Sequence, residues 1–329
     1  MCEISVIIPF YRSEKYIKDC MKSVIQSEVF EKCEVILIND GSPDRSPEIA
    51  QNIANKYRNI KIYHYHNSGL SAARNRGLEH STGRFVFFLD SDDFLKKDYL
   101  CKLYHEAERT ESEVIFSGFS KVGEDGKNEK QVSRSLLNTQ QIMDGCQFLN
   151  LKMDLGDWNN EVCCALYRRE FLEENSLKFD EDIKLYEDIL FTNKILLYAK
   201  KVGTIPIYGY MYRYNEQSLV QGGVKKRDIT SSLEVLNRFI NIYYELDKGK
   251  RRTFGRVFYE HISMILYYVG QVNVRNKQAY YKVLSSNEIL KILRSSITTP
   301  KEGVKYLIFR YCICLYYPLV RKREGKDAN

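Results

Sequence analysis

The sequence predicts an α/β protein with a mostly parallel sheet flanked by helices, followed by a helical basic C-terminal extension. Over the first hundred residues, short β-branched and aromatic runs alternate with stretches of helical spacing. The strand-like runs are apolar throughout, as in parallel sheets covered on both faces. From Lys225 onward, 21 Lys and Arg stand against 9 Asp and Glu, whereas the first 224 residues carry 29 basic and 34 acidic residues. This uneven charge predicts a division at about residue 223.

Four expected strands alternate with three expected helices at the start of the chain. Pro9 is expected to end the first strand, because proline donates no ladder hydrogen bond. Strands are expected at residues 4–8, 33–38, 60–64 and 84–89. Helices are expected at residues 14–27, 47–57 and 69–79. Ligands of such sheets bind beyond the carboxyl ends of the strands, so the polar loops there become candidate sites.

The rest of the chain is less regular. A short strand is expected at 114–116, an exposed loop at 121–134, and a late strand at 202–208. Helices are expected at 140–151 and 187–199, and the aromatic segment 210–214 follows. From about residue 224 the pattern is helical, apolar and basic. The expected division is therefore 1–223 and 224–329.

Composition narrows the class of protein. With 44% hydrophobic and 28% charged residues, the chain is expected to fold and not to be disordered. Nine cysteines without a C-x-x-C pair, and five scattered histidines, give no readable zinc site. Unpaired cysteines and a start without a signal peptide predict a cytoplasmic location. The apolar stretch 311–320 is too short to cross a bilayer.

An acidic cluster follows the fourth expected strand. Asp90, Asp92 and Asp93 lie within four residues, and such carboxylates repel one another unless a cation neutralises them. A hard divalent ion whose shell is completed by phosphate oxygens suits this arrangement. A simple helix cap is the alternative, but it requires only one acid.

Two further loops carry polar candidates with ordinary alternatives. Asp40 and Asp44 flank Gly41 after the second strand, where a carboxylate could bind a nucleobase or ribose; the alternative is a plain turn. Arg74 lies on the third expected helix, where its fork could bind phosphate or an acidic loop; the alternative is a solvated helix surface that also carries Arg76.

A last candidate pair opens the helix at 187. Sugar transfer with inversion needs a base for the acceptor hydroxyl, and Glu187 or Asp188 at a helix start would stay ionised. Capping of the helix is the alternative reading.

Four motifs in order resemble one family. They are Ser5-Val-Ile-Ile-Pro-Phe-Tyr11, Val35-Ile-Leu-Ile-Asn-Asp-Gly-Ser-Pro-Asp44, Asn67-Ser-Gly-Leu-Ser-Ala-Ala-Arg-Asn-Arg-Gly77 and Phe88-Leu-Asp-Ser-Asp-Asp93. Together they resemble the family-2 glycosyltransferases of bacterial polysaccharide synthesis. A weaker match, through Leu166-Tyr-Arg-Arg, Phe179-Asp and Glu187-Asp-Ile-Leu-Phe191, extends to about residue 214.

The resemblance implies a GT-A fold with a nucleotide-binding half at 1–95 and an acceptor half at 96–223. It also implies a UDP-sugar donor. By this resemblance Pro9 and Tyr11 line the base pocket, and Asp40 contacts uracil. Asp44 lies nearby, and Asn67 borders the nucleotide.

The resemblance also assigns the diphosphate and sugar end. Mn²⁺ or Mg²⁺ is implied, with Asp92 as its ligand. Arg74 would border the nucleotide and Asp90 would approach the ribose. Asp93 would assist or orient the sugar, and Arg213 would lie near the diphosphate.

On the acceptor side, the resemblance implies inversion with Asp188 as the base, supported by Glu187. The acceptor would be a glycan or a lipid-linked glycan. One departure lies here: Cys163-Cys164-Ala165 stands where such enzymes commonly carry a Trp and a Lys. It affects the identity of the acceptor and leaves the donor chemistry in place.

Other classes fit less well. A sugar nucleotidyltransferase normally has a Gly-rich loop after its first strand, and residues 9–13 contain no glycine. No G-x-G-x-x-G follows that strand, which disfavours hydride transfer. A non-catalytic nucleotide-sugar-binding subunit of an assembly complex stays open, although Asp92 and Asp188 argue for catalysis.

The basic C-terminal part could meet an anionic surface. It carries no recognisable nucleic-acid motif, so no nucleic acid partner is expected. The apolar stretch 311–320 with Tyr316 and Tyr317, followed by Arg321-Lys322-Arg323, predicts a peripheral contact with the inner face of the membrane. A solvated basic surface is the alternative.

Overall fold

The computed structural model describes residues 2–132, 134–139, 141–157, 162–214, 224–272, 277–297, 299–300, 302–311 and 313. Its chain forms two compact units, residues 1–221 and 222–329. Each unit has its own core, and each is described below by itself.

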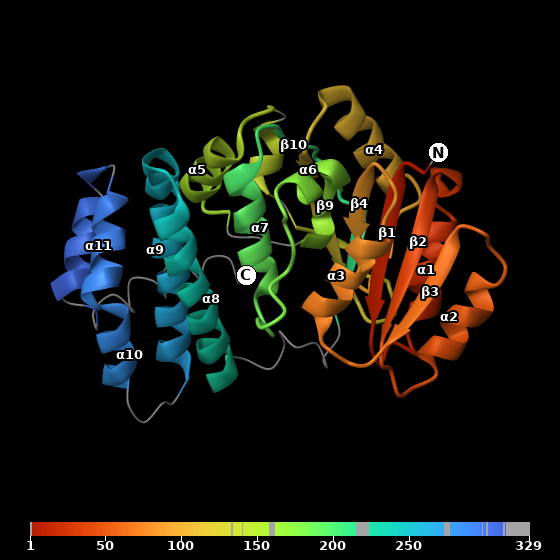
Figure 1. Cartoon of the computed structure of the whole chain (residues 1–329), viewed down its shortest axis with the longest axis horizontal. Helices are drawn as coiled ribbons and strands as arrows, with labels where there is room; N and C mark the ends of the chain where they lie inside the picture. The colour runs from red at the N-terminus through yellow and green to blue at the C-terminus, as the bar shows by residue number, and fades with distance from the viewer. Residues whose placement is uncertain are drawn as a thin grey trace. The chain divides into compact units, whose positions relative to one another are not determined.

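Strands and helices alternate in the first unit (Figure 1). Its strands are β1 Ile4–Phe10, β2 Cys33–Asp40, β3 Ile60–Tyr65, β4 Phe85–Phe88, β5 Phe94–Leu95, β6 Val114–Phe116, β7 Phe119–Val122, β8 Lys130–Gln131, β9 Ala165–Arg168, β10 Val202–Thr204 and β11 Tyr210–Arg213. Its helices are α1 Ile17–Ile25, α2 Ser46–Ala54, α3 Leu70–His80, α4 Tyr99–Thr110, α5 Gly145–Leu155, α6 Arg169–Glu174 and α7 Glu187–Tyr198.

A seven-stranded sheet forms the centre of this unit, in the order β10-β6-β9-β4-β1-β2-β3. The strands β3, β2, β1 and β4 are parallel to one another, as the apolar runs predict. Order 3-2-1-4 reverses direction between β1 and β4. In open α/β sheets, ligands bind at such a reversal, beyond the carboxyl ends of the strands.

The first strand continues through Pro9 to Phe10, so the expectation that Pro9 ends it is wrong. Pro9 shares its side of β1 with Ile7, whose carbonyl accepts a hydrogen bond from Leu89 of the β4 side. Because β4 ends at Phe88, a proline at this position loses no ladder hydrogen bond. On the other side of β1, the register with β2 runs on to Phe10.

Two features of the sheets differ from the expectation. Strand β9 runs antiparallel between β4 and β6, so the large sheet is mixed. A second sheet, in the order β5-β11-β7-β8, includes both ends of the segment expected as a loop at 121–134. The aromatic segment 210–214 contains strand β11, which belongs to this second sheet. The late strand is shorter than expected and ends at Thr204.

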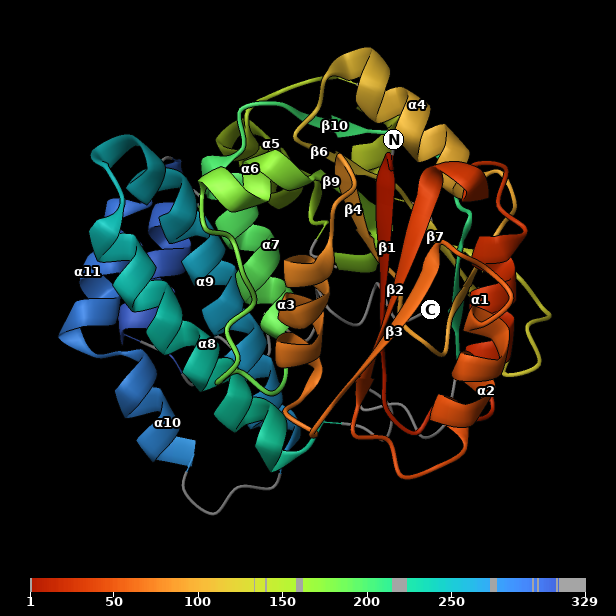
Figure 2. The same ribbon diagram turned by 45° about the vertical axis from the view of Figure 1, so that its right-hand side comes forward.

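Helices cover both faces of the large sheet. Figures 1 and 2 show α3 on one face and α1 with α2 on the other. Alternate side chains of β1, such as Val6 and Ile8, pack in one buried cluster with Ile17 of α1 and Leu103 of α4. Across the sheet, Gly77 of α3 lies so close to Ile7 that a Cβ would come within 2.2 Å of the Ile7 Cγ2. This close approach places α3 directly against β1.

The second unit is helical, as its pattern predicts. Its helices are α8 Lys226–Glu245, α9 Lys248–Gln271, α10 Lys277–Leu284 and α11 Asn287–Ser295, and residues 302–311 are also helical. Buried aromatic side chains from α8 and α9 form its core, with Phe239 against Phe254 at 5.0 Å between ring centroids. Within the described residues, no helix is both long and apolar enough to cross a membrane. Residues 314–323 of the proposed membrane segment lie outside the described part.

Candidate active site

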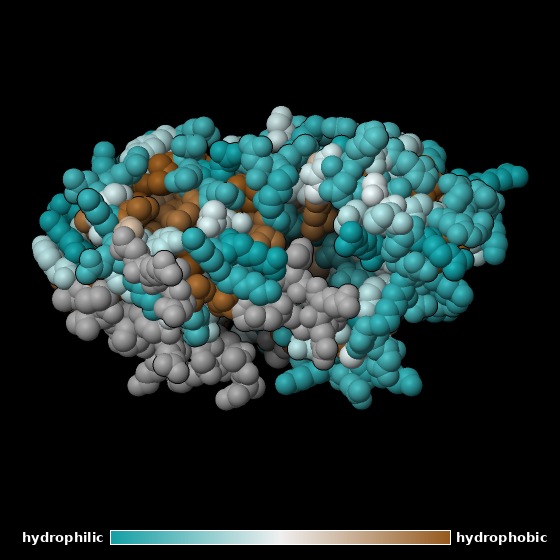
Figure 3. Space-filling view, turned by 90° about the horizontal axis from the view of Figure 1, so that it is seen from below, coloured by the Kyte–Doolittle hydropathy of each residue, from teal (hydrophilic) through white to brown (hydrophobic). Residues whose placement is uncertain are grey.

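The candidate site lies where the loops after β1 and β4 meet. Ser13 and Ser91 join these loops through a hydrogen bond of 2.6 Å between their hydroxyl oxygens. Figure 3 looks at the molecule from the end at which these strands finish, and much of the surface seen over the first unit is hydrophilic. Sequence-predicted residues from four loops gather around this end.

Asp40 ends β2 and holds the start of α3. Its two carboxylate oxygens accept hydrogen bonds from the backbone N–H groups of Ser68 and Gly69, each at 2.9 Å. Arg76 forms an ion pair with the same carboxylate at 3.4 Å. Asn67 donates from its side chain to the Asp40 carbonyl at 2.9 Å. These bonds join Asp40 and Asn67 in one loop pair, and contact of either residue with a nucleotide stays a prediction.

Gly41 allows this pairing of loops. Its φ is +69°, which favours glycine, and a Cβ there would lie 2.7 Å from the backbone nitrogen of Asn67. Asp44 then joins the β2 loop to the β1 loop, since it accepts hydrogen bonds from the Glu14 backbone at 3.0 Å and from Ser46 at the start of α2. Burial acts to raise the pKa of Asp44, but these hydrogen bonds and one from Ser42 outweigh it and lower the pKa.

Asp93 supports the loop after β4 from inside the protein. Its side chain is 1% exposed and accepts hydrogen bonds from the Tyr210 hydroxyl at 2.6 Å and the Arg213 backbone at 2.7 Å. Burial, together with the charges of Asp92 and Asp90, raises the pKa of Asp93 well above its usual value. The expectation that Asp93 contacts the sugar does not fit this position, because the carboxylate is enclosed by β11.

Arg213 also acts on this loop. Its Nε donates to the Asp92 carbonyl at 2.9 Å and its guanidinium donates to the Glu124 carbonyl at 2.6 Å. The guanidinium carbon lies 5.1 Å from the ring centre of Tyr16 and 5.0 Å from that of Phe94. The expected contact of Arg213 with a diphosphate does not fit this buried side chain, which holds the loop backbone instead.

Asp92 differs from its neighbours. Within the described part of the chain, no other residue donates a hydrogen bond to its carboxylate, and its side chain is partly exposed. Burial and the charge of Asp90 raise the pKa of Asp92 to about 6. A neighbouring cation would stabilise the charged form of such a carboxylate.

The residues present fit a cation that is held mainly by its substrate. No group of three or more carboxylate, thiol or imidazole side chains among the described residues could hold a metal ion alone. Magnesium usually takes one or two protein carboxylates and completes its shell with phosphate oxygens and water. Asp92 supplies such a carboxylate, whereas Asp93 is enclosed by its hydrogen bonds.

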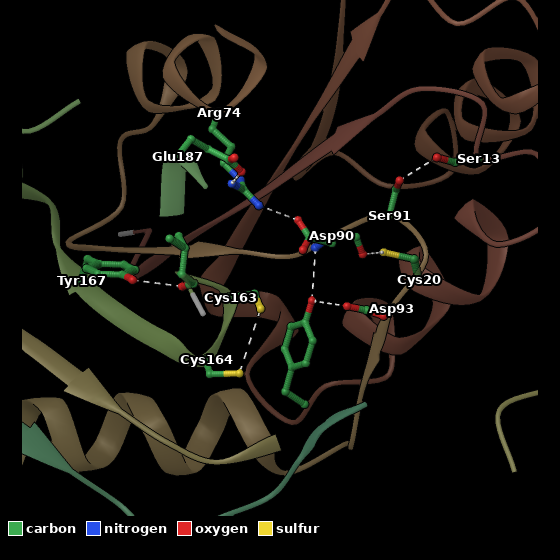
Figure 4. Close-up of polar contacts among 12 residues, drawn as sticks. Ser13, Cys20, Arg74, Asp90, Ser91, Asp93, Cys163, Cys164, Tyr167 and Glu187 are labelled. Atoms are coloured by element: carbon green, nitrogen blue, oxygen red, sulfur yellow. Dashed lines mark hydrogen bonds and ion pairs between the residues drawn. The ribbon is translucent and has the colours of Figure 1, made fainter. Parts of the chain in front are cut away.

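Arg74 connects the donor loop to helix α7 (Figure 4). Its two terminal nitrogens donate to Asp90 and to Glu187, each at 2.9 Å. Although burial acts to lower it, the charges of these two carboxylates raise the pKa of Arg74 above its ordinary value. The Arg74 side chain is 4% exposed and pairs with Asp90 of the acidic loop, so the alternative of a solvated helix surface does not hold for it.

Asp188 follows Glu187 in the first turn of α7. Its carboxylate accepts a hydrogen bond from the Ile189 backbone at 2.8 Å, and its side chain is partly exposed. Arg74 pairs with both Glu187 and Asp90. The predicted base Asp188 and its neighbour Glu187 therefore belong to the same cluster as Asp90. The role of Asp188 as a base stays a prediction.

Pro9 and Tyr11 lie at the end of β1. Pro9 is buried in the strand, while the Tyr11 side chain is 43% exposed and lies beside Arg12, with 5.3 Å between the guanidinium carbon and the ring centre. An exposed aromatic ring at the carboxyl end of a central strand is available for stacking with a base. The base pocket stays a prediction for both residues.

Sequence reasoning missed the parts played by Tyr210 and Arg76. Tyr210 binds Asp93 across 117 positions of the chain, and no local pattern reports such a contact. Arg76 pairs with Asp40 and stacks on Tyr65, with 4.4 Å between the guanidinium carbon and the ring centre. Arg76 lies inside the motif at residues 67–77, but the motif does not indicate its partner.

The sequence of this chain resembles those of known proteins. The profile of glycosyl transferase family 2 matches residues 5–175, just over half of the chain. The chain is 34% identical to the uncharacterized glycosyltransferase EpsJ of Bacillus subtilis (strain 168) over 220 residues, which are 66% of this chain and 63% of EpsJ. It is 37% identical to the minor teichoic acid biosynthesis protein GgaA of the same strain over 221 residues, 65% of this chain and 47% of GgaA. The chain thus spans less than two thirds of either relative.

The fold itself matches a solved structure. The crystal structure of S. aureus TarS residues 1–349 in complex with UDP-GlcNAc covers 98% of this chain, with a TM-score of 0.75 and 22% sequence identity. The match covers 92% of that TarS chain. This likeness confirms the predicted GT-A fold. With the profile match and the ordered motifs at the carboxyl ends of β1 to β4, the chain belongs to glycosyl transferase family 2.

Proposed function

We propose that this chain is an inverting glycosyltransferase that moves a sugar from a UDP-sugar to an acceptor hydroxyl in the synthesis of a cell-surface polysaccharide. One observation carries the proposal: Asp92, with its pKa raised to about 6, lies on a loop that Arg74 ties to the helix bearing Asp188. A site for a cation and a candidate base therefore belong to one cluster. Membership of the family supports the reaction class.

The donor class is supported by the neighbours. GgaA is named for minor teichoic acid biosynthesis, and the TarS structure contains UDP-GlcNAc. In this chain we assign the nucleotide to residues 1–95 and the acceptor, a glycan or lipid-linked glycan, to residues 96–223. Pro9 and Tyr11 would form the base pocket. Asp40, Asp44 and Asn67 would shape the loops around the nucleotide through the hydrogen bonds described above.

The diphosphate end of the site requires positive charge. Asp92 would ligate Mn²⁺ or Mg²⁺, which would neutralise the charge that develops on the leaving diphosphate. Asp90 stands beside it and already shares one oxygen with Arg74. The raised pKa of Asp92 supports this assignment, because a nearby cation would relieve the repulsion between the two carboxylates.

Asp188 would perform the proton transfer. Its carboxylate would take the proton of the acceptor hydroxyl while that oxygen forms its bond to the anomeric carbon. The bond from this carbon to the diphosphate breaks, and its electron pair leaves with UDP. Attack from the side opposite the diphosphate inverts the configuration at the anomeric carbon.

The deciding experiment is a screen of nucleotide-sugars with the purified chain. We expect release of UDP from at least one UDP-sugar in the presence of Mn²⁺ or Mg²⁺ and no release with a chelator. Nucleoside triphosphate consumption instead would indicate a nucleotidyltransferase. Binding of UDP-sugars without any turnover would indicate a non-catalytic subunit.

Asp188→Asn tests the base. Loss of a general base typically lowers the rate about 10²–10⁴-fold while donor binding survives. The variant should therefore bind UDP as the unmodified chain does and transfer poorly. If UDP affinity falls while the rate of bound donor is kept, Asp188 is a binding residue and the assignment is wrong. Asp182→Asn, at an exposed position before α7, serves as the matched control.

The same proposal includes a peripheral place at the inner face of a membrane. In the helical stretch 302–311, Val304, Leu307 and Tyr311 are exposed at a spacing that puts them on one face of the helix. From residue 303 to residue 323 the sequence holds five basic and no acidic residues. Anionic lipid attracts each nearby basic side chain by about 1 kcal/mol, and an exposed apolar stripe allows shallow insertion.

Vesicle flotation tests this location. The intact chain should float with anionic liposomes at low salt and detach at high salt, because salt screens surface charge. A chain that ends at Thr299 should float less. Flotation that ignores lipid charge, or none at all, would retire the membrane contact and leave the transfer reaction unaffected.

A further inference from the structure

Arg74 occupies a position that its sequence motif does not reveal. Its guanidinium lies between two carboxylates and is held through both terminal nitrogens, NH2 to Asp90 and NH1 to Glu187 (Figure 4). The Nε is buried and has no hydrogen-bond partner among the residues that the structure describes. The ring of Phe179 lies 5.2 Å from the guanidinium carbon. Both terminal nitrogens thus bind carboxylates of the protein, and the guanidinium is enclosed beside an aromatic ring.

The two partners come from different parts of the chain. Asp90 follows β4 by two residues and lies 16 positions from Arg74, whereas Glu187 is the first residue of α7 and lies 113 positions away. Arg74 itself belongs to α3, which Gly77 fixes against β1. One arginine on a fixed helix therefore joins the loop of the proposed donor site to the helix that carries the proposed base.

The first turn of α7 depends on this contact. The residue before the helix, Tyr186, has a φ of +68°, an unfavourable value for a side chain of its size, and it gives the helix no side-chain cap. Glu187 is buried, so its charge needs a partner inside the protein. Arg74 supplies that partner, and Asp188 stands on the next residue of the same turn.

We propose that Arg74 is a positioning residue, which sets the carboxylate of Asp188 relative to the donor loop by clamping Glu187 and Asp90 together. Arginine suits this task because its planar fork can bind two carboxylates at once, whereas a lysine is a single point charge. The inference rests on the proposed transfer reaction, in which Asp188 is the base. It replaces the expectation that Arg74 borders the nucleotide.

A double-mutant cycle tests the clamp. Arg74→Gln and Glu187→Gln should each lower kcat for transfer by at least about tenfold, with the KM for the UDP-sugar within about threefold of the original. Because both act through one ion pair, the double variant should lose about as much as the worse single variant, not the product of the two. Multiplied losses would overturn the proposal.

Arg74→Lys gives a second reading. Its single ammonium keeps the charge but binds the two carboxylates less well, so kcat should lie between those of the original chain and Arg74→Gln. A variant that loses UDP affinity at unchanged kcat would show that Arg74 contacts the nucleotide, which overturns positioning. Arg109→Gln, an exposed arginine of α4 paired with Glu106, is the matched control and should leave kcat unchanged.

Folding is controlled within the same set. Arg74→Gln leaves two carboxylates without their cation, so it could fail to fold, and the double variant with Glu187→Gln removes one of these charges. Circular dichroism and the thermal midpoint identify which variants are folded. If only the double variant folds, kcat near that of the original chain would overturn the proposal.

A structural readout separates this inference from the reaction itself. Absence of transfer from every nucleotide-sugar would sink the proposed function and leave the clamp open to test by amide hydrogen exchange. The amides of residues 190–193 bond the carbonyls of the first turn of α7 and should exchange at least about tenfold faster in Arg74→Gln than in Arg109→Gln. Equal exchange in the two variants would overturn the positioning role.

Discussion

Two loops rich in carboxylates lie at the same edge of the large sheet, one after β2 and one after β4. The pKa shifts of their carboxylates have opposite signs. In the loop after β2, Asp40 and Asp44 receive hydrogen bonds from backbone N–H groups and serine hydroxyls, and the pKa of Asp44 is lowered. In the loop after β4, burial and neighbouring carboxylates raise the pKa of Asp92 to about 6 and raise that of Asp93 well above its usual value.

The difference lies in the supply of donors. Four donor atoms from Ser42, Ser46 and Glu14 bind the Asp44 carboxylate, whereas Asp92 receives no hydrogen bond from another described residue. In the first loop, groups of the protein supply the hydrogen-bond donors that the Asp44 carboxylate needs. In the second loop Arg74 pairs with Asp90, and an added cation would neutralise the remaining charge of Asp92 at neutral pH. A dense acidic motif therefore indicates a ligand only where the fold leaves its carboxylates without donors.

The largest expected effect comes from removing the carboxylate that lacks donors. Asp92→Asn should lower metal-dependent turnover of a UDP-sugar at least about 10²-fold, because the neutral amide no longer attracts the cation that stabilises the leaving diphosphate. A chelator should bring the original chain to a similar level. Steady-state release of UDP measures both. Asp98→Asn, which removes a surface carboxylate paired with Lys102, is the matched control. Full turnover in Asp92→Asn would assign the cation elsewhere.

The next effect is on pH. Since the pKa of Asp92 is about 6 without metal, its carboxylate is charged above this pH and protonated below it. Binding of Mn²⁺ should weaken about tenfold for each unit of pH below 6 and change little above 7. Titration calorimetry at pH 5, 6 and 7.5 gives the slope. A pH-independent affinity over this range would contradict the role of Asp92.

The fold around these loops is largely readable from sequence, for a physical reason. Strands β1, β2 and β4 are buried on both faces, so strand pattern, sheet type and burial agree there, whereas β3 at the edge of the sheet is partly exposed. Strand β9, which pairs antiparallel between β4 and β6, was not predicted, because four residues are too few to show an alternation of apolar and polar side chains. Strand β11 was not predicted either, because it also has only four residues.

The site was readable only as a set of residue types. The motifs identify which acids gather at the sheet edge, but which carboxylates are satisfied depends on distant donors. Asp93 was expected to assist or orient the sugar, but its carboxylate accepts a hydrogen bond from Tyr210, 117 positions away, which no local pattern reports. For Arg74 the sequence left both a bound and a solvated guanidinium open, and its contacts with Asp90 and Glu187 show that the side chain is buried.

In the loop after β2, substitution of Asp44 should have a moderate effect on stability. Asp44→Ala removes an acceptor at the start of α2, which typically costs about 0.5–2 kcal/mol. The lowered pKa of Asp44 means that this stabilisation is present above its unfolded pKa near 3.8 and is lost as pH falls through the folded value. The deficit relative to the original chain should therefore shrink towards pH 3 in urea unfolding. Glu48→Gln, an exposed acid of α2, is the control.

The smallest expected effect has the opposite sign and comes from the other loop. A raised pKa means that charge on Asp92 is disfavoured in the folded chain, so its favourable term is complete below the unfolded pKa near 3.8 and is lost as pH rises through about 6. Asp92→Asn removes this charge. At pH 7.5 with chelator, the variant should be more stable by on the order of 1 kcal/mol, a rise of roughly 2–4 °C in the thermal midpoint. Below the unfolded pKa near 3.8 the gain should vanish, because Asp92 is then protonated in the folded and the unfolded chain. Saturating Mn²⁺ should raise the midpoint of the original chain and leave that of Asp92→Asn where it was. If Asp92→Asn instead lowers the midpoint at pH 7.5, as Asp44→Ala should, then the loop after β4 is satisfied by donors within the protein and the contrast between the two loops fails.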